Sequence, residues 1–318
     1  MLGIKKHAPN VNITYAAGDR GAGFAYNATE KLWYKYLAGK NHVNCIATKF
    51  AFNPKAVVGT ALHGLIYAPH DHHRFWRYSH RHSFQVSLLR AHGVFDGGFV
   101  SFDDHREIDR RLPKDGRVLM TGGAKSGLVL FEHNDTSDYF EGYAYQVKGE
   151  EIVFHRIPRA MPWGKEAVAI TGSAKVAAAV IDKQIWMFRL QRKRGWGVVN
   201  LSMQEEFAQL LKGNVAMTCL SSATPVSYTG ALRGLLLKDG RMFGYNIISR
   251  NIELTEKTLA GGANIHIEGE KATLVGSSRY GLVFTGGNIY SYLSYGAEIL
   301  YKRLEVFLHP PMEIEEQY

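Results

Sequence analysis

The residues with the clearest chemical potential are histidines, and they are concentrated in one part of the chain. Eight of the 14 histidines fall between residues 63 and 105. Imidazole rings next to a carboxylate can ligate zinc or another divalent metal ion. One interpretation of this region is therefore a metal or ligand site. The densest run, with the cation and the indole that follow it, comprises His70, Asp71, His72, His73, Arg74 and Trp76.

The same run fits a contact surface better than a metal site. It lies between two strand-like stretches, at the position of a hairpin turn, and such turns are exposed. Arginine and tryptophan are residue types enriched at protein interfaces. We therefore predict an interface and no bound metal. The other candidate interface residues stand in charged or glycine-rich stretches: Arg106, Arg110, Arg111, Trp163 and Trp196.

Motifs that would identify an enzyme are missing from the sequence. The stretch Thr121-Gly122-Gly123-Ala124-Lys125 resembles a phosphate-binding loop only superficially, because alanine precedes its lysine where glycine is needed. There is no His-Glu-x-x-His, Gly-x-Ser-x-Gly, dinucleotide-binding or EF-hand pattern. The sequence predicts neither an enzymatic activity nor a cofactor. A paired-carboxylate site of the glycosidase type stays open for Asp96, Asp103, Asp104, Asp109, Asp135, Asp138, Glu141 and Glu166.

A repeat organises the elements that would position these residues. Residues 121–130 and 171–180 share Thr, Gly, Ala and Lys at a spacing of 50, and each stretch follows a short apolar run. A looser pattern occurs six times: a glycine or alanine, an apolar run, a polar turn and an aromatic alternation. The aromatic residues that end the six copies are Tyr36, Tyr78, Tyr143, Phe188, Tyr245 and Tyr292.

Each copy predicts a group of four short strands. A continuous apolar run suits a strand that is buried on both faces, and the alternation suits a strand with one wet face. The turns at 238–240 and 285–288 contain glycine with Asp or Asn, which tight hairpins need. Four strands in about 50 residues are typical of a β-propeller blade. We predict an all-β fold, a single β-propeller domain over residues 1–318 with about six blades, five to seven being compatible with the length. Two β-sandwiches are the alternative.

Three segments depart from the repeat. Residues 89–117 are extra between the second and third copies, and they predict an inserted hairpin or a partial blade. Residues 202–212 predict one short helix, because Ser202 and Glu205 form a capping box. Residues 309–318 form an acidic, proline-kinked tail.

The composition predicts a soluble protein made in the cytoplasm. No apolar run is long enough for a membrane helix or a signal peptide. Cys45 and Cys219 are too few for a disulfide framework, so we expect two buried thiols. The 38 Lys and Arg residues exceed the 29 Asp and Glu residues, which gives a formal net charge of +9. Such a surface favours phosphate, an anionic glycan or an acidic partner protein.

A basic, cysteine-poor propeller without a catalytic motif resembles the nozzle and hub proteins of short-tailed bacteriophages. The resemblance is one of architecture and composition over the whole chain, and no motif is shared. It implies a structural component of the virion tail, in which a ring of copies forms part of the genome-exit conduit. Its implied partners are other copies of the chain, neighbouring tail proteins and transiently passing DNA, with no membrane insertion and no small-molecule substrate.

Two rival interpretations belong to other classes. The first is a propeller enzyme or glycan-binding module that uses the histidine-rich segment as a metal or ligand site. The second is a cellular interaction platform. Stoichiometric bound metal would favour the enzyme, a monomer would count against the ring, and co-purification with tail proteins would favour the virion component.

Overall fold

The computed structural model describes the chain from Ile13 to Gln317, apart from several stretches. The predicted helix at 202–212 lies outside the described residues, except for the buried Leu211. Among the residues that are described, no helix has the length and apolar character needed to cross a membrane. The stretches left out are 28, 49, 51, 61, 70–72, 81–83, 96–97, 102–117, 134–138, 158–166, 173–175, 182–183, 192–194, 202–210, 212–215, 221–231, 249, 261–271, 286 and 313–314.

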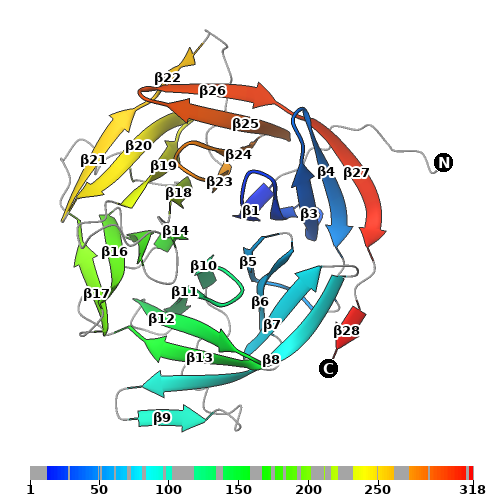
Figure 1. The fold of residues 1–318 in the computed structure, drawn as a ribbon, viewed down its shortest axis with the longest axis vertical. Helices are drawn as coiled ribbons and strands as arrows, with labels where there is room; N and C mark the ends of the chain where they lie inside the picture. Colours follow the sequence, from blue (N-terminus) through cyan, green and yellow to red (C-terminus); the bar gives the residue numbers. More distant parts are fainter. Residues whose placement is uncertain are drawn as a thin grey trace. The chain divides into compact units, whose positions relative to one another are not determined.

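Six groups of four antiparallel strands follow one another along the chain, and in each group the strands pair in sequence order (Figure 1). This connectivity is that of propeller blades, so the predicted fold class, an all-β propeller of about six blades, is confirmed. Blade 1 holds β1 (Ile13–Gly18), β2 (Ala22–Asn27), β3 (Leu32–Ala38) and β4 (His42–Thr48). Blade 2 holds β5 (Ala56–Gly59), β6 (His63–Pro69), β7 (His73–His80) and β8 (Phe84–Phe95).

The other four blades repeat the same order of strands. Blade 3 holds β10 (Val118–Gly122), β11 (Ser126–His133), β12 (Tyr139–Lys148) and β13 (Glu151–Arg156). Blade 4 holds β14 (Ala167–Gly172), β15 (Val176–Ile181), β16 (Gln184–Gln191) and β17 (Gly195–Asn200). Blade 5 holds β18 (Ala216–Leu220), β19 (Leu232–Lys238), β20 (Arg241–Ile248) and β21 (Asn251–Glu256). Blade 6 holds β23 (Thr273–Gly276), β24 (Tyr280–Thr285), β25 (Asn288–Tyr295) and β26 (Glu298–Arg303).

The chain divides into two compact units, each with three blades. Unit 1 is formed by residues 1–49 and 201–313 and contains blades 5, 6 and 1. Its first strands β18, β23 and β1 are neighbours, and Thr273 Oγ1 donates a hydrogen bond to the Ile13 carbonyl at 3.2 Å. Unit 2 is formed by residues 50–200 and 314–318 and contains blades 2, 3 and 4. There β5, β10 and β14 are neighbours, and Thr121 Oγ1 donates to the Gly172 carbonyl at 3.1 Å.

The repeat seen in the sequence is a real structural repeat. In blade 3, Thr121 pairs with Leu128 and Gly122 pairs with Gly127. In blade 4, the same pairing joins Thr171 to Ala178 and Gly172 to Ala177, so segments 121–130 and 171–180 occupy equivalent places. One assignment in the repeat was wrong. Tyr145, and not Tyr143, pairs with Gly127 and therefore corresponds to Tyr36, Tyr78 and Tyr292 in the other blades.

The repeated tyrosine fixes the turn between the first two strands of its blade. Each hydroxyl donates to a carbonyl in that turn, and a glycine at the start of the second strand leaves room for the ring to cross. A Cβ atom on Gly281, for example, would lie 2.4 Å from Tyr292 Oη. The four hydrogen bonds run from Tyr36 to Asp19 (2.7 Å), Tyr78 to Thr60 (2.6 Å), Tyr145 to Gly123 (3.0 Å) and Tyr292 to Ser277 (2.6 Å).

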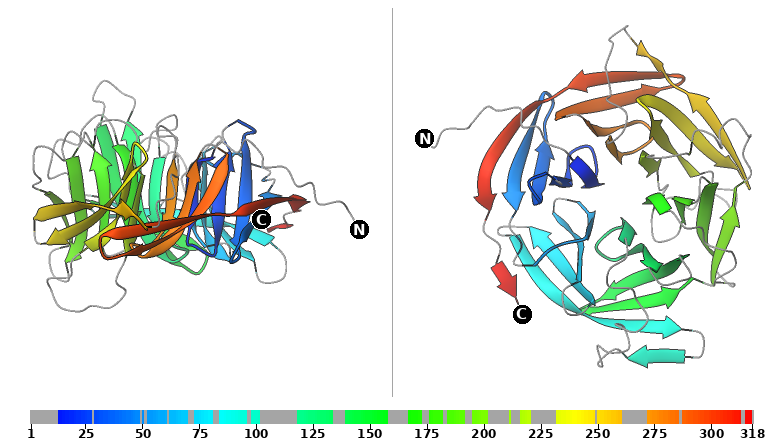
Figure 2. Two further views of the ribbon diagram at one scale, coloured as in Figure 1. Left: turned by 90° about the horizontal axis from the view of Figure 1, so that it is seen from above. Right: turned by 180° about the vertical axis from the view of Figure 1, so that it is seen from behind.

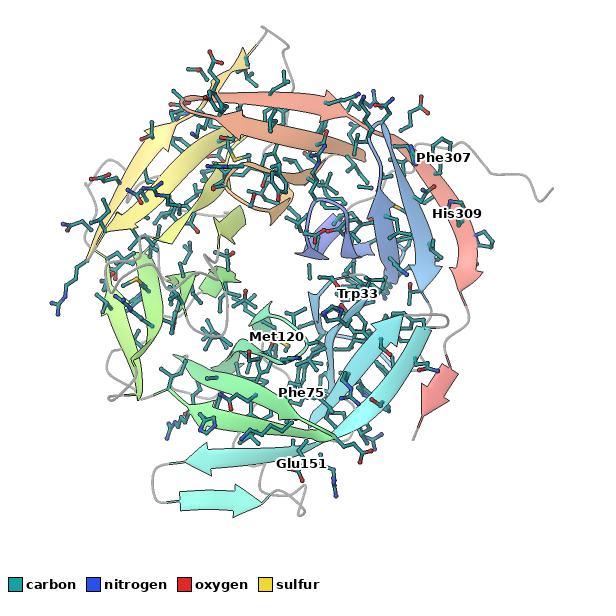
Figure 3. All side chains as sticks on the ribbon, in the orientation of Figure 1. Trp33, Phe75, Met120, Glu151, Phe307 and His309 are labelled. Atoms are coloured by element: carbon teal, nitrogen blue, oxygen red, sulfur yellow. The ribbon has the colours of Figure 1, made fainter. Side chains whose placement is uncertain are left out.

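Burial falls from the second strand of a blade to its outer strand. Strands β6, β15 and β24 are buried along almost their whole length, as the continuous apolar runs predict. Strands β21 and β26 alternate between buried and exposed residues. The core lies between neighbouring blades of a unit. In unit 2, for example, Phe75 and Met120 belong to the cluster shared by blades 2 and 3 (Figure 3).

Extra strands cover the outer edges of several blades. Strand β27 (Glu305–Met312) pairs in parallel with β4 and runs beside it in Figure 2. Strand β28 (Glu315–Gln317) pairs in parallel with β8, and β22 (Thr258–Leu259) pairs in parallel with β26. Much of the acidic tail at 309–318 is therefore strand. Because an open strand edge invites pairing with other chains, these strands protect the blades that carry them.

The insertion at 89–117 begins as a continuation of blade 2. Strand β8 runs on to Phe95, where residues 90–94 pair in parallel with β13 of blade 3. It then pairs antiparallel with β9 (Gly98–Ser101), which makes a hairpin. Residues 102–117 lie outside the described part of the chain, so the assignment of the whole insertion stays a prediction.

Candidate binding surface

The structure describes only some of the residues that we predicted for an interface. His73 begins β7 and Trp196 lies on β17, but only their backbones are described. Arg74 is half-buried on β7. The remaining candidates lie outside the described residues: His70, Asp71, His72, Arg106, Arg110, Arg111 and Trp163.

Trp76 is buried within the described part of blade 2, and its predicted role at an interface stays a prediction. Its side chain is 2% exposed, and its ring stacks on Phe52 with centroids 4.7 Å apart. Trp76 falls on the same face of β7 as the buried Tyr78, and Phe75 on the opposite face is buried as well, so both faces of the strand are covered here. A partner protein would have to displace this stack to reach it.

Glu141 is the one described member of the carboxylate set, and it has structural partners. Tyr143 donates a hydrogen bond to Glu141 Oε2 at 2.5 Å, and Arg156 forms an ion pair with Oε1 at 2.5 Å. Both partners lie in the same blade. Within the described part of the chain, no group of three or more His, Cys, Asp or Glu residues could hold a metal ion. The described cysteine, Cys45, is a buried thiol as expected, and burial raises its pKa to about 12.

A patch of exposed apolar residues stands at one end of blade 6. Tyr280 on β24 pairs with Leu293 on β25, and Leu293 pairs with Leu300 on β26. Directly opposed residues share one face of a sheet, so the three side chains form a row across the blade. Tyr295 lies two residues beyond Leu293 and therefore on the same face. We call these four residues the blade 6 patch. Tyr280 is 46% exposed, Leu293 53%, Leu300 48% and Tyr295 86%.

Two turns fix the tyrosines of the blade 6 patch. Tyr280 ends the turn between β23 and β24, in which Ser277 Oγ accepts hydrogen bonds from the amides of Arg279 (3.2 Å) and Tyr280 (3.3 Å). Tyr295 begins the turn to β26, and Lys257 Nζ donates a hydrogen bond to the Gly296 carbonyl in that turn. Burial lowers the pKa of Lys257. The backbone turns that carry the two aromatic rings are therefore held by hydrogen bonds.

Blade 1 contributes a cation to the patch. The guanidinium of Arg20 lies over the Tyr280 ring, 5.9 Å from its centroid. Arg20 sits in the turn between β1 and β2, which corresponds to the turn before Tyr280 in blade 6. Asp19 stabilises that turn, because its Oδ1 accepts hydrogen bonds from the amides of Gly21 (2.8 Å) and Ala22 (2.9 Å).

The patch is exposed because blade 1 covers the face of blade 6 only as far as the neighbouring row of paired residues, which contains Ser291 and Lys302. Lys302 lies two residues beyond Leu300 on β26 and pairs with Ser291. Its Nζ donates to Asn41 Oδ1, in the last turn of blade 1, at 2.6 Å. The row nearer the end of the blade, which holds Tyr280, Leu293 and Leu300, extends past this contact. Blade 6 therefore leaves an apolar surface uncovered next to the turns of blade 1.

Sequence reasoning missed this surface, although a signal was present. Strands β25 and β26 carry large apolar residues at consecutive positions, and therefore on both faces, as in Tyr292 with Leu293 and Ile299 with Leu300. An outer strand with one wet face should carry large apolar residues only at every second position. The additional apolar residues, on the face that should be polar, are those of the blade 6 patch.

Comparison with known proteins supports the fold and gives no family. No family model matches the chain, and no curated protein matches it. Among solved structures, a mutant Aleuria aurantia lectin in complex with Fucα1-6GlcNAc has a TM-score of 0.50 at 10% identity, covering 92% of this chain and 97% of that one. A second structure of this fungal lectin, described as a six-bladed β-propeller with a fucose recognition mode, has a TM-score of 0.47 at 10% identity, with 91% and 93% covered. The major Malassezia sympodialis allergen Mala s 1 has a TM-score of 0.46 at 10% identity, with 93% and 79% covered.

Proposed function

We propose that the chain is a glycan-binding module and that it binds through the blade 6 patch. The observation that carries this proposal is the pair of exposed tyrosines on one face of the blade. A tyrosine ring packs against the C–H face of a sugar, while its hydroxyl exchanges hydrogen bonds with the sugar hydroxyls. Arg20 adds a donor next to Tyr280.

The size of the patch favours a small ligand over a protein. A standard protein interface engages about 20 to 30 residues on each side. The blade 6 patch has four large apolar side chains on three neighbouring strands, bordered by the turns of blade 1. A short glycan covers a surface of this kind without needing a larger apolar area.

The structural neighbour with a TM-score of 0.50 gives limited support of its own. It is a lectin in complex with a fucose-containing disaccharide, so this fold does hold glycan sites. At 10% identity the likeness concerns the fold, and propellers carry many functions. The proposal therefore depends on the patch and not on the neighbour.

Binding to a glycan array, followed by titration calorimetry on the best ligand, tests the proposal. Tyr295→Ala should weaken binding about fivefold or more, because an aromatic contact contributes about 1 kcal/mol. Leu62→Ala is the matched control, since Leu62 is a 57% exposed apolar residue in a turn of blade 2. The control should bind as the unchanged protein does. An array without any bound glycan, or equal affinities for the Tyr295 variant and the unchanged protein, would refute the proposal.

The predicted place in a bacteriophage tail stays a prediction. The structures named above do not include a virion protein. They do not test the ring of copies, the neighbouring tail proteins or the passing DNA. Light scattering for the mass of the particle and co-purification with tail proteins remain the measurements that decide it.

A further inference from the structure

Positive and negative charges are distributed unevenly around the blade 6 patch. On β26, Glu298, Leu300 and Lys302 share one face, with the carboxylate at the turn and the ammonium two residues past the patch. The turns of blade 1 add Arg20 and Lys40, both exposed. The side of the patch next to blade 1 thus carries three cations, Arg20, Lys40 and Lys302, together with the carboxylate of Asp19, and Glu298 lies at the opposite corner.

Arg20 is the cation best placed to meet a ligand. Its guanidinium rests over the Tyr280 ring, and no described carboxylate forms an ion pair with it. The neighbouring carboxylate of Asp19 has one oxygen directed to the amides of its own turn. Arginine held against an aromatic ring keeps its planar fork free to bind a carboxylate with two parallel hydrogen bonds.

Glu298 is too far from Arg20 to replace such a ligand. Tyr280 is separated from Leu300 by two strand spacings, about 9 to 10 Å, and Glu298 lies two residues further along β26. A saccharide that spans the patch would meet Arg20 at one end and Glu298 at the other. Its acidic group would be attracted to the first end and repelled from the second.

We propose that the blade 6 patch selects saccharides that carry a carboxylate, with Arg20 binding the carboxylate and the two tyrosines binding the sugar ring. This inference rests on the proposed glycan-binding function and adds the class of ligand to it. It also assigns Arg20 as the residue that determines specificity. The formal net charge of +9 draws the same ligands to the surface but does not orient them.

A matched pair of ligands tests the selectivity. Trigalacturonic acid and its fully methyl-esterified form differ in charge and share their ring structure, and titration calorimetry measures the affinity for each. The acid should bind at least about tenfold more tightly, because hydrogen bonds to a charged group are the stronger kind. Arg20→Gln should reduce this ratio to about one, mainly by weakening the binding of the acid. Arg250→Gln, which removes an exposed arginine from a turn of blade 5, should leave the ratio unchanged.

The possible results separate this inference from the proposed function. Equal affinities for acid and ester, or a ratio that survives Arg20→Gln, would overturn the selectivity while glycan binding stands. A ratio that falls equally in the Arg20 and Arg250 variants would assign the preference to net charge and also overturn it. If neither the two ligands nor any glycan on the array binds, the proposed function itself fails.

Discussion

In blades 1, 2, 3 and 6 a tyrosine crosses a glycine at the start of the second strand, and Gly281 shows how little room this crossing leaves. A Cβ atom there would lie 2.0 Å from the Val275 carbonyl oxygen and 2.4 Å from Tyr292 Oη. The carbonyl belongs to the backbone and cannot move without breaking the pairing of β23 with β24. Gly281→Ala should therefore lower the free energy of unfolding by about 2 to 4 kcal/mol, measured by urea denaturation.

Gly123→Ala is the control for this prediction. Gly123 occupies the corresponding turn of blade 3, and a Cβ atom there would meet nothing within 4 Å. Its substitution should leave the free energy of unfolding within about 0.5 kcal/mol of the original value. Equal losses in the two variants would show that the crossing of tyrosine over glycine does not constrain the blade.

At the scale of elements, local pattern predicted the strands inside a blade but not those between blades. The apolar run at 281–284 and the turn at 238–240 are local signals. The structure has a buried β24, and Asp239 and Gly240 adopt positive φ angles of 48° and 76°. Strand β27 pairs with β4, whose partner residues lie more than 260 positions away, so no local pattern could reveal it. Pro310 and Pro311 also argue against a strand, and they are tolerated here because β27 lies at an edge, where its register shifts.

Removal of β27 tests what this edge strand contributes. The strand covers the edge of β4, and Val306 and Leu308 pack against the core cluster of blades 1 and 6. His309 also contacts Asn44 Oδ1 at 2.9 Å, and Figure 3 marks its place on β27. A chain that ends at Leu304 should lose about 2 kcal/mol or more of stability, since it no longer has the two apolar side chains that pack against this cluster.

Hydrogen exchange locates the effect of this truncation. The amides of β4 should exchange faster, because their partners on β27 are gone. The amides of β15, which lies in unit 2, serve as the internal control and should exchange at the same rate as before. A truncated chain in which residues 42–48 keep their original protection would show that β27 adds nothing to this edge.

For the whole molecule, the sequence indicated the fold class and the excess of positive charge, but not the blade 6 patch. The patch needs Arg20 and Tyr280 in contact, and these residues lie near opposite ends of the chain. Its exposure also depends on how far blade 1 reaches along blade 6, which the Lys302 to Asn41 hydrogen bond sets. Only the folded unit brings these residues together. The apolar pattern of β25 and β26 could have marked the leucines and Tyr295, but no local pattern could reveal the contact with Arg20.

The effect of net charge can be measured apart from the patch by retention on a sulfonate cation-exchange column, which carries no carboxylate. Retention by a dense polyanion depends on the summed surface charge and falls with salt, because charges in water are screened. Arg20→Gln and Arg250→Gln each lower the formal net charge from +9 to +8. Both variants should therefore elute at nearly the same, slightly reduced salt concentration. A much earlier elution of the Arg20 variant alone would mean that the polyanion itself binds at the patch and that retention is not a measure of overall charge.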